Sequence, residues 1–597
     1  MSIVHNWAAK DPVTYLPVGI DKFIFYESPR PGQNLWCHTK LADGSNLEMP
    51  SLSAEIYVCD DDGRVLCRAI GFRVGRASRE QLAASLQEDL SGFMYTPSFD
   101  QVEEEIEIEK PEEQGSWLVV PDQTMASGLV DKLTASGEVC VTVQTGSSYS
   151  VDGRTVTIDP LVTEHYIQMM KDGKLWDDLP EIRGIVHLSS IDCTDSLEPS
   201  FEQLEESHAI GSRSVLHLSQ ALAEMKSKAR LRLVTRGSQA VAEGDKPMVC
   251  AAPVWGMGKV IELEVPRVRA KRVDLGTGDQ LDLLVNEILS NNDEDEVVLR
   301  DGARFVSRIV PKKKTKEVSV QMKADHTYII TGGFGGLGLL VAKKLVERGA
   351  RDITLLGRRG APASVKGALQ DLTEKGVTVR SMKADVASEE DIMSVVSTLE
   401  AAKIAIAGVM HAAGYLDDKQ ISKMDWESVE IVMASKVKGT RNLHVATKHL
   451  DLHFFVLFSS ASSAIGNVGQ ANYAAANAFM DTFAHARRAA GLAAMSINWG
   501  PWAEVGMAAA MNFDGGLNSL PAAQGIGVFL QSLGMADTAQ MVVAAMNWMK
   551  FLQAFGKQMP AIFRSISGKK KKGGSGSDSA VKKKLMSYQK PAGMRCW

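Results

Sequence analysis

The fold of this chain is decided by one glycine-rich stretch, Thr331-Gly332-Gly333-Phe334-Gly335-Gly336-Leu337-Gly338. It follows the apolar run 326–331 (HTYIIT), which predicts a buried strand, and it precedes LLVAKKLVERGA, whose apolar spacing predicts a helix. A strand, a glycine turn and a helix in this order are the context of a dinucleotide-binding fingerprint. Glycines let the backbone approach a pyrophosphate, and the first turn of the helix offers free N–H groups. The alternative, an ordinary tight turn, does not need five glycines in seven residues.

The residues after the second strand indicate which dinucleotide binds. The run 352–356 (DITLL) predicts that strand, and Gly357-Arg358-Arg359-Gly360 follows it. A carboxylate at this position would bind the ribose 2′-hydroxyl of NAD, and the sequence has none there. Two guanidinium groups suit a 2′-phosphate, so the sequence favours NADPH. A solvated basic turn is the alternative interpretation of the two arginines.

Two further strand ends are expected to face the same cofactor. The run 378–384 (TVRSMKA) predicts a third strand, which leads to Asp385 and Val386 as an adenine contact. The run 407–411 predicts a fourth strand, which ends at His411 and is followed by Ala412, Ala413 and Gly414. Ligands of open α/β sheets bind where the carboxyl ends of parallel strands meet. The stretch therefore predicts an α/β fold with a doubly wound parallel sheet.

The next strand and helix bring together residues suited to reducing a ketone. The apolar run 454–458 (FFVLF) ends at Ser459 and Ser460. The segment 472–484 has high helix propensity and places Tyr473 and Asn477 one turn apart on the same face.

Reduction of a carbonyl creates an oxyanion that needs a hydrogen-bond donor and then a proton. Tyr473 is the expected acid, because Lys436 can supply the cation that favours its phenolate. Ser460 can hold the carbonyl oxygen, and Asn477 can position Lys436 or a water. The alternative for Tyr473 is a core tyrosine with a satisfied hydroxyl, and Ser462 and Ser463 compete for the serine role.

These segments resemble the ketoreductase domains of modular polyketide synthases and animal-type fatty acid synthases, a branch of the short-chain dehydrogenase/reductases. In the wider superfamily a lysine stands four residues after the tyrosine, whereas in this branch that site is Asn and the lysine lies earlier. Asn477 and Lys436 follow the branch pattern, and the family spacing selects Ser460 among the serines. The matching segments are TGGFGGLG, HAAGYLDD, SKVKGTRNLH, FVLFSSASSAIGNVGQANYAAANAFMD and INWGPW.

The resemblance implies a substrate and a stereochemical course. The substrate would be a 3-oxoacyl chain on the phosphopantetheine arm of an acyl carrier protein. Phosphopantetheine is therefore expected only as the arm of the substrate's carrier, and not as a cofactor of this chain. Leu416-Asp417-Asp418 resembles the signature of B-type ketoreductases, and Leu457 stands where A-type enzymes have tryptophan. B-type enzymes give the D-configured 3-hydroxyacyl product, with Asp418 as the diagnostic residue. Without the family, the aspartate pair is equally typical of a solvated loop and helix cap.

The region before the glycine turn predicts a second Rossmann-like unit. Strand-like runs such as 117–121 (WLVVP) and 231–235 (LRLVT) alternate with helical patterns, yet Asp122-Gln123-Thr124 replaces the glycine fingerprint. We expect it to bind no nucleotide, and it resembles the structural subdomain that braces the catalytic half in this family. We place the structural subdomain at residues 113–315, the catalytic domain at 316–566 and a flexible charged tail at 567–597.

The N-terminal segment 1–76 is expected to differ from the rest of the chain. Its runs read as antiparallel strands with a hairpin at Asp61-Asp62-Gly63, an α+β pattern that resembles the C-terminal half of a double-hotdog dehydratase. The half with the catalytic histidine is missing, so we expect no dehydratase activity. A lone hotdog half would expose its partner face, which suggests a homodimer or a neighbouring synthase domain. Residues 77–112 are expected to form a linker.

Composition excludes several classes of function. The chain has 597 residues and a net charge of −6, which favours neither nucleic acid nor an anionic membrane as a partner. Seven scattered cysteines form no metal-ligand or disulfide pattern, and no apolar run reaches membrane-spanning length. The N-terminus has the features of neither a signal nor a transit peptide, so a cytoplasmic protein without a metal is expected.

Three hypotheses follow for the function. The first is an NADPH-dependent 3-oxoacyl-thioester reductase that acts on a carrier protein supplied by another chain or another part of this one. The second is a reductase of a free small ketone. The third is a non-catalytic scaffold fragment, against which the complete set of Ser460, Tyr473, Lys436 and the glycine turn argues.

Overall fold

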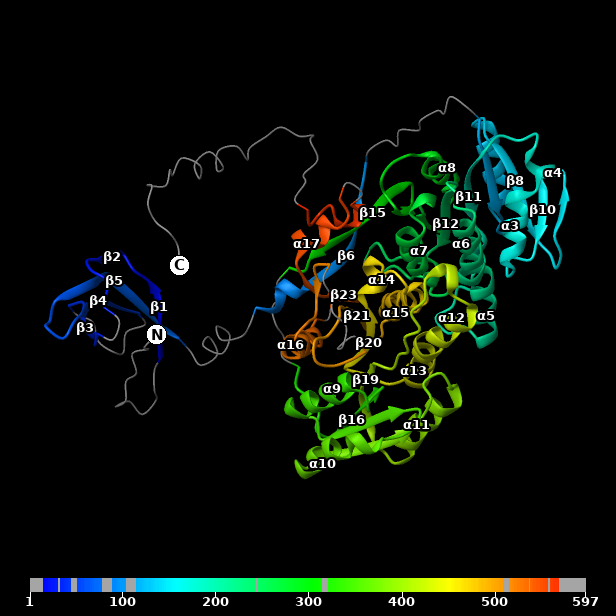
Figure 1. Cartoon of the computed structure of the whole chain (residues 1–597). Helices are drawn as coiled ribbons and strands as arrows, with labels where there is room; N and C mark the ends of the chain where they lie inside the picture. The colour runs from blue at the N-terminus through cyan, green and yellow to red at the C-terminus, as the bar shows by residue number, and fades with distance from the viewer. Residues whose placement is uncertain are drawn as a thin grey trace. The chain divides into compact units, whose positions relative to one another are not determined.

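The chain folds as two compact units, Met1–Asp89 and Leu90–Trp597, shown in Figure 1. A computed structural model describes residues 14–30, 33–43, 51–77, 89–103, 114–242, 244–313, 320–507, 515–535, 537–556 and 559–567. Most of the linker predicted over 77–112 and nearly all of the predicted tail lie outside these residues.

The first unit is an antiparallel sheet. Its strands run in the order β1-β5-β4-β3, and β2 also pairs with β5. The hairpin between β4 and β5 closes where Asp60 accepts the N–H groups of Asp62 and Arg64, which confirms the turn predicted at this position. The strands are β1 (Thr14–Gly19), β2 (Lys22–Phe25), β3 (Trp36–Leu41), β4 (Ser51–Cys59) and β5 (Val65–Ala77).

The second unit contains the predicted doubly wound parallel sheet. Its strands lie in the order β18-β17-β16-β19-β20-β21-β23, all parallel. The chain starts at β16, moves outward to β18, then returns to β19, so the strand order reverses between β16 and β19. Ligands bind at the carboxyl ends of such a switch point. The strands are β16 (His326–Thr331), β17 (Asp352–Gly357), β18 (Thr378–Lys383), β19 (Ala405–His411), β20 (Phe454–Ser460), β21 (Met495–Trp499) and β23 (Gln540–Val543).

The part of the second unit that contains this sheet corresponds to the predicted catalytic domain and is called the catalytic half below. Its helices connect and cover the parallel strands. Apolar residues of α9, such as Val341 and Leu345, pack on β16 and β17 in one buried cluster, while Met480 and Ala484 of α15 pack in another. The chain also contains a π-helix, η7 (Ala434–Lys438), between α12 and α13. The helices are α9 (Gly336–Glu347), α10 (Lys366–Glu374), α11 (Glu389–Ala401), α12 (Trp426–Met433), α13 (Gly439–Thr447), α14 (Ala461–Ile465), α15 (Ala471–Ala489) and α16 (Ala522–Ser532).

The N-terminal half of the second unit is the expected Rossmann-like sheet. Its strands β8, β7, β11, β12, β13 and β14 are parallel neighbours in that order. The Asp122 carboxylate accepts the N–H groups of Thr124, Met125 and Ala126 at the start of α2. It therefore occupies the place that a nucleotide phosphate takes in a glycine fingerprint. The elements used below are β7 (Ser116–Val120), α2 (Ala126–Ala135), β8 (Val139–Thr145), β11 (Ile182–His187), α5 (Phe201–His208), α6 (Ser214–Glu224), β12 (Arg230–Arg236), α7 (Ala252–Glu264), β13 (Lys271–Leu275) and β14 (Glu296–Arg300).

Strand β6 (Met94–Gln101) corrects the prediction of a linker over 77–112. It pairs antiparallel with β15 (Ala303–Pro311) along its length and with β23 through Tyr95 and Met94. It thus joins the sheets of the two halves into one continuous sheet. The sequence MYTPSFDQ hides this strand, because Pro97 interrupts it and polar residues occupy most of its second half.

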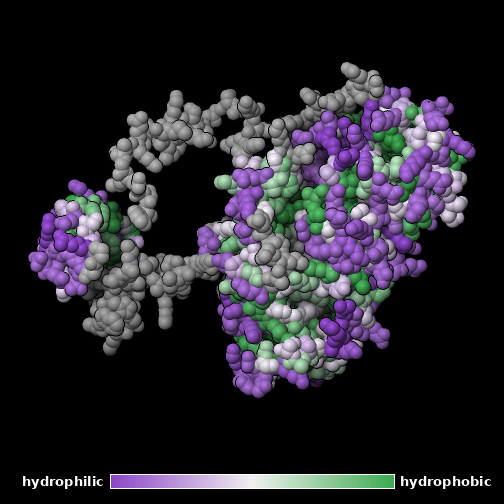
Figure 2. Space-filling model, in the orientation of Figure 1, coloured by the Kyte–Doolittle hydropathy of each residue, from purple (hydrophilic) through white to green (hydrophobic). Residues whose placement is uncertain are grey.

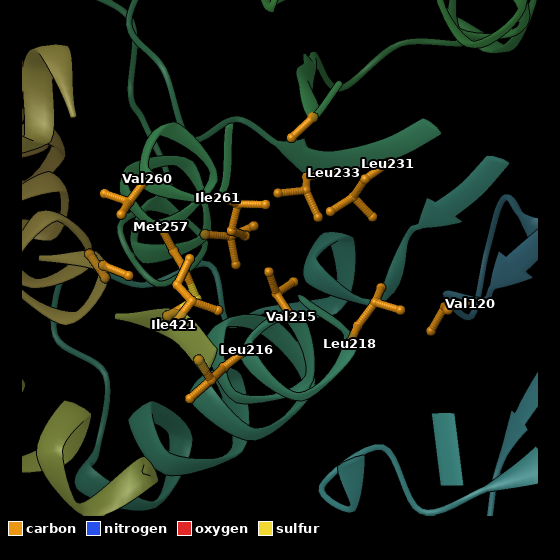
Figure 3. Close-up of a cluster of buried hydrophobic side chains, with 14 of the residues drawn as sticks. Val120, Val215, Leu216, Leu218, Leu231, Leu233, Met257, Val260, Ile261 and Ile421 are labelled. Carbon is orange, nitrogen blue, oxygen red and sulfur yellow. The ribbon is translucent and has the colours of Figure 1, made fainter. Parts of the chain in front are cut away.

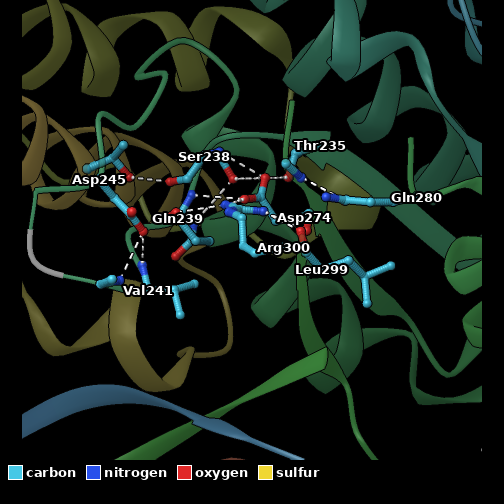
Figure 4. Close-up of polar contacts among 12 residues, drawn as sticks. Thr235, Ser238, Gln239, Val241, Asp245, Asp274, Gln280, Leu299 and Arg300 are labelled. Carbon is cyan, nitrogen blue, oxygen red and sulfur yellow. Dashed lines mark hydrogen bonds and ion pairs between the residues drawn. The ribbon is translucent and has the colours of Figure 1, made fainter. Parts of the chain in front are cut away.

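A polar network and an apolar core hold the N-terminal half together. Buried Asp274 of β13 accepts from Thr235 at 2.6 Å, from the Ser238 N–H at 2.8 Å and from Arg300 at 2.5 Å (Figure 4). The Ser238 carbonyl in turn accepts from Thr482 of α15, which ties this network to the catalytic half. Figure 3 shows the apolar core around α6 and α7. On the molecular surface seen in Figure 2, polar residues lie between apolar ones.

Candidate active site

The glycine turn forms a tight cradle between β16 and α9. Gly332 has a φ of +64°, a left-handed conformation that favours glycine. A Cβ atom on Gly332 would lie 2.9 Å from the Ala412 carbonyl, and one on Gly338 would lie 2.7 Å from the Gly333 Cα. The backbone therefore closes on itself without room for side chains, and the start of α9 is left open for a pyrophosphate. These residues fit a dinucleotide.

A buried hydrogen-bond chain fixes the end of β19 to the cradle. His411 is fully buried, its Nε2 lies 3.0 Å from the Ser435 carbonyl and its Nδ1 lies 2.7 Å from the Thr331 hydroxyl. A carbonyl only accepts, so Nε2 carries the proton and Nδ1 accepts from Thr331. Burial, together with the charge of Lys436, lowers the pKa of His411 to about 3, so the ring is neutral. Both ring nitrogens are thus bonded inside the protein, and the cofactor contact expected of His411 stays a prediction.

The two arginines after β17 project outward beside the cradle. Both Arg358 and Arg359 are exposed, and within the described residues neither guanidinium has a hydrogen bond or ion pair. Phe334 of the glycine turn packs on Gly357, where an added Cβ would lie 2.7 Å from its ring. The turn and the arginines are therefore neighbours, as a 2′-phosphate site requires.

The third strand end is held by its own backbone contacts. Asp385 accepts the N–H of Ala387, and its own N–H donates to Asp391 at 2.7 Å. Val386 is buried, its carbonyl accepts from Asn442, and its methyl groups lie against Gly439. The side chain of Val386 is therefore held inside the fold and Asp385 is half-buried, and the expected adenine contact of both residues stays a prediction.

A cavity of about 250 Å³ lies next to the cradle and receives the ketone-reducing residues. Ala412 and Gly414 line it beside Leu337 of the glycine turn. The residues expected from the sequence to carry the chemistry line the same cavity from three different elements: Lys436 from η7, Ser460 from the end of β20 and Tyr473 from the first turn of α15.

Lys436 is buried beneath the tyrosine. Its Nζ donates to the Phe458 carbonyl at 2.9 Å and lies 5.2 Å from the centre of the Tyr473 ring. Burial lowers the pKa of Lys436 to about 7, and the negative charge of Asp481 opposes this shift. The cation is thus placed to act on the Tyr473 ring and is close to its titration point at neutral pH.

Tyr473 and Asn477 share one face of α15. Burial raises the pKa of Tyr473 to about 12, and the Asn477 amide opposes this rise, so the tyrosine holds its proton at neutral pH. Asn477 is fully buried, its amide donates to the Tyr473 carbonyl at 2.7 Å, and its Oδ1 has no partner among the described residues. A buried acceptor without a donor fits the expected role of holding Lys436 or a water.

Ser460 caps helix α14 at the cavity wall. Its Oγ accepts from the N–H of Ser462 at 3.2 Å and from the Ser462 hydroxyl at 3.1 Å, so its own proton is free to donate into the cavity. Ser463 instead donates to Asp481 at 2.6 Å. The hydroxyls of the competing serines Ser462 and Ser463 therefore already donate within the protein, and the role of Ser460 stays a prediction.

Leu416 and Asp418 line one side of the cavity together with Gln470, and this side is called its rim below. Asp418 accepts from Gln470 at 3.0 Å, and the Asp417 carbonyl accepts from Asn472 at 2.8 Å. The loop that carries the aspartate pair is thereby attached to the start of α15, immediately before Tyr473.

Comparisons with known proteins agree with this geometry. Residues 326–504 match the family model described as KR domain, residues 1–84 match polyketide synthase dehydratase N-terminal domain, and residues 116–292 match beta-ketoacyl synthase-like, N-terminal. A solved structure described as an A1-type ketoreductase is 27% identical with a TM-score of 0.69, over 80% of this chain and 98% of that one. The first ketoreductase of the tylosin PKS is 26% identical with a TM-score of 0.67, over the same shares.

Curated relatives are large synthases. The polyketide synthase GfsA of Streptomyces halstedii is 33% identical over 75% of this chain and 6% of its own length. One of the phenolphthiocerol/phthiocerol polyketide synthase proteins of Mycobacterium tuberculosis is 29% identical over 94% of this chain and 30% of its own length. The chain thus spans less than a third of these relatives.

This chain carries the ketoreductase region of a polyketide synthase, preceded by a dehydratase segment. The dehydratase match names the N-terminal domain, whereas the strand pattern indicated the C-terminal half. Because the solved ketoreductases match over 80% of this chain, the likeness extends beyond residues 326–504 into the N-terminal half of the second unit. A ketoreductase uses a nicotinamide cofactor, which the glycine cradle fits.

The described residues of this ketoreductase contain neither a candidate membrane-spanning helix nor a candidate metal site. None of its described helices combines the length and apolar character needed to cross a membrane. Among the same residues, no three His, Cys, Asp or Glu side chains gather so that they could hold a metal ion.

Sequence reasoning missed one buried carboxylate behind the ketoreductase site. Asp481 accepts from Ser463 and Ser496, each at 2.6 Å, and from Asn498 at 2.7 Å. Asn498 also donates to the Ser460 carbonyl at 3.2 Å, so the network reaches Ser460. Asp481 lies four residues after Asn477 on α15, and this spacing is the signal in the sequence that would have indicated it.

Proposed function

We propose that the ketoreductase reduces a 3-oxoacyl thioester, carried by an acyl carrier protein, to the D-3-hydroxyacyl thioester with NADPH. The observation that carries the proposal is the meeting of Tyr473, Ser460 and Lys436 in one cavity beside the glycine cradle. The carrier protein and its phosphopantetheine arm come from another chain or from another part of the synthase. The exposed Phe23, Phe25 and Trp36 of the dehydratase segment suit contact with a second copy or a neighbouring synthase domain.

The residues of the chain divide the work of reduction. Bound NADPH supplies the hydride that adds to C3 of the substrate. Ser460 and Tyr473 hold the carbonyl oxygen by hydrogen bonds that strengthen as its negative charge develops. Tyr473 then gives its proton to that oxygen, and Lys436 stabilises the phenolate that remains. Asn477, whose amide donates to the Tyr473 carbonyl, has an unpartnered Oδ1 that can hold Lys436 or a water.

The D-configuration rests on the loop residues Leu416, Asp417 and Asp418, and on Leu457 in place of tryptophan. Two of the solved relatives are described as A-type ketoreductases, so these residues, rather than overall likeness, carry the stereochemical proposal. Asp418 lines the cavity, where it can limit how the substrate enters, and Asp417 precedes it in the same loop.

The central test is Tyr473→Phe. With a 3-oxoacyl-pantetheine thioester and NADPH, we expect wild type to oxidise NADPH and give the D-alcohol on chiral analysis. The variant lacks the proton donor and should lose activity by about 10³-fold or more, since it loses both acid catalysis and an oxyanion donor. NADPH binding, measured by fluorescence titration, should stay unchanged. Undiminished turnover in the variant would refute the mechanism, and an L-alcohol would refute the B-type assignment.

The preference for NADPH predicts an effect of Arg358→Ala. Loss of a guanidinium that pairs with the 2′-phosphate should raise the KM for NADPH about tenfold or more, because a charge-assisted hydrogen bond contributes about 1.5–3 kcal/mol. The KM for NADH, which has no 2′-phosphate, should change little and serves as the internal control. Equal effects on both cofactors would assign Arg358 to a solvated turn.

A further inference from the structure

We propose that Glu264 and Gln220, two side chains of the N-terminal half, are positioning residues that set the stereochemical course of the ketoreductase. They hold the loop that carries Leu416 and Asp418 from outside the cavity, without lining it. The inference rests on the proposed function, because it concerns the same site.

Ile421, three residues after Asp418, is bonded to the N-terminal half through both of its backbone polar groups. Its N–H donates to Glu264 Oε2 at 2.6 Å, and its carbonyl accepts from Gln220 Nε2 at 3.0 Å. Gln220 also donates to the Met424 carbonyl at 2.6 Å. The Ile421 side chain is fully buried in the apolar core of the N-terminal half, near Met257 in Figure 3.

The second oxygen of Glu264 holds the facing loop. Oε1 accepts the N–H of Gly469 at 2.7 Å, and the Gly469 carbonyl accepts the N–H of Lys419 at 2.9 Å. Gln470 follows and donates to Asp418. One carboxylate therefore spans both loops that form this rim of the cavity.

Glu264 and Gln220, together called the clamp, are themselves held in place by contacts within the N-terminal half. Glu264 ends α7, which is fixed to β13 because buried Arg272 donates to the Gly258 carbonyl at 2.8 Å and pairs with Glu262 at 3.0 Å. The Gln220 amide is oriented by the Thr163 hydroxyl, which donates to its Oε1 at 3.0 Å and leaves Nε2 facing Ile421. The position of the rim is thus set by the N-terminal half.

The rim position matters because hydride transfer depends on which face of the ketone is presented. Displacing a reacting group by about 1 Å can reduce the rate about 10²-fold. A loose rim would also let the substrate bind in the second orientation. Loss of the clamp is therefore expected to change the ratio of the two alcohols as well as the rate.

The test is Glu264→Gln, which keeps the size of the side chain but turns one acceptor into a donor that faces an N–H. We expect kcat/KM for the 3-oxoacyl-pantetheine thioester to fall about tenfold and the minor alcohol to become measurable. The KM for NADPH should stay constant, because the glycine cradle is not touched. Gln220→Ala, which leaves Glu264 in place, should shift the alcohol ratio in the same direction by a smaller amount.

Glu205→Gln is the matched control. Glu205 of α5 pairs with Lys438 of η7 at 3.5 Å, across the same two halves but away from both loops. It should retain the wild-type alcohol ratio. A folded, active Glu264→Gln enzyme with the wild-type ratio and kcat/KM would overturn the clamp alone. A wild-type chain that reduces no thioester would instead count against the proposed function. Amide hydrogen exchange at Ile421 and Gly469, expected to quicken in Glu264→Gln, reports on the clamp even then.

Discussion

Asp481 links the polar interior to the reacting residues of the site. It follows Tyr473 and Asn477 on one face of α15, and burial raises its pKa against the hydrogen bonds that it accepts from Ser463 and Ser496. Its charge also raises the pKa of Lys436, which burial lowers to about 7. The carboxylate therefore helps to keep the lysine charged at neutral pH.

The pH profile of kcat should report this coupling. Tyr473, with a pKa of about 12, stays protonated through the neutral range, whereas Lys436 loses its charge as the pH rises through about 7. Reduction should therefore slow on the alkaline side. Asp481→Asn removes the charge that raises the Lys436 pKa, so this fall should begin at a lower pH. Ser496→Ala, which keeps the carboxylate, is the control, and an unmoved alkaline limb in Asp481→Asn would contradict the coupling.

Residue chemistry indicated a tyrosine, a serine and a lysine, because few residue types donate a proton or stabilise a phenolate, and the family resemblance selected Ser460 among the neighbouring serines. The sequence did not show which of the candidate side chains are buried. His411 ends a strand that faces the cofactor, yet its side chain turns inward to Thr331 and Ser435. The roles given to the other cofactor residues stay predictions.

At the scale of elements, a close helix contact joins the two halves beside Tyr473. Helix α7 packs on α15, and Gly256 lies directly against Ala474, the residue after Tyr473. A Cβ on Gly256 would lie 2.7 Å from the Ala474 carbonyl carbon and 2.8 Å from the Ala478 Cβ. Both helices are buried here, so neither can move away without opening the core.

Gly256→Ala should lower the free energy of unfolding by about 1–3 kcal/mol, since overpacking a close helix contact forces the backbones apart. It should also lower kcat, because α15 carries Tyr473. Gly367→Ala on α10, where an added Cβ meets nothing within 4 Å, is the control and should be neutral or slightly stabilising. Urea unfolding compares the two variants, and equal midpoints would contradict the close contact.

The predicted elements succeeded where the apolar pattern was continuous and failed where it was broken. The runs at β16, β17, β19 and β20 are buried on both faces of a parallel sheet, so they read clearly as strands. Strand β6 carries Pro97 and lies far along the chain from its partners, which a local pattern does not reveal. The two π-helices, η3 (Ala209–Arg213) and η7, also lack a sequence signal.

At the scale of the whole molecule, β6 joins the sheets of the two halves of the second unit. It covers the edge of β15 in the N-terminal half and the edge of β23 in the catalytic half. Tyr95 of the same strand accepts from Trp548 at 3.0 Å, which adds a side-chain contact on the catalytic side.

Shortening the chain tests this. A chain of residues 90–567 keeps β6 and should be soluble and active. A chain of residues 114–567 exposes both strand edges, which are templates for association, so it should aggregate and lose most activity. Size-exclusion chromatography and NADPH oxidation compare the two. Equal behaviour would show that the halves hold together without β6.

Strand β6 also sets an order of events during synthesis. It leaves the ribosome before either of its neighbours, and it gains β15 only after the whole N-terminal half has been made. Its second neighbour, β23, follows Tyr473 in the chain and is made later still. Domains fold from the N-terminus as they emerge, so the nascent N-terminal half must wait with one open strand. While the catalytic half is being translated, β6 therefore offers a preformed strand edge with which β23 can later pair.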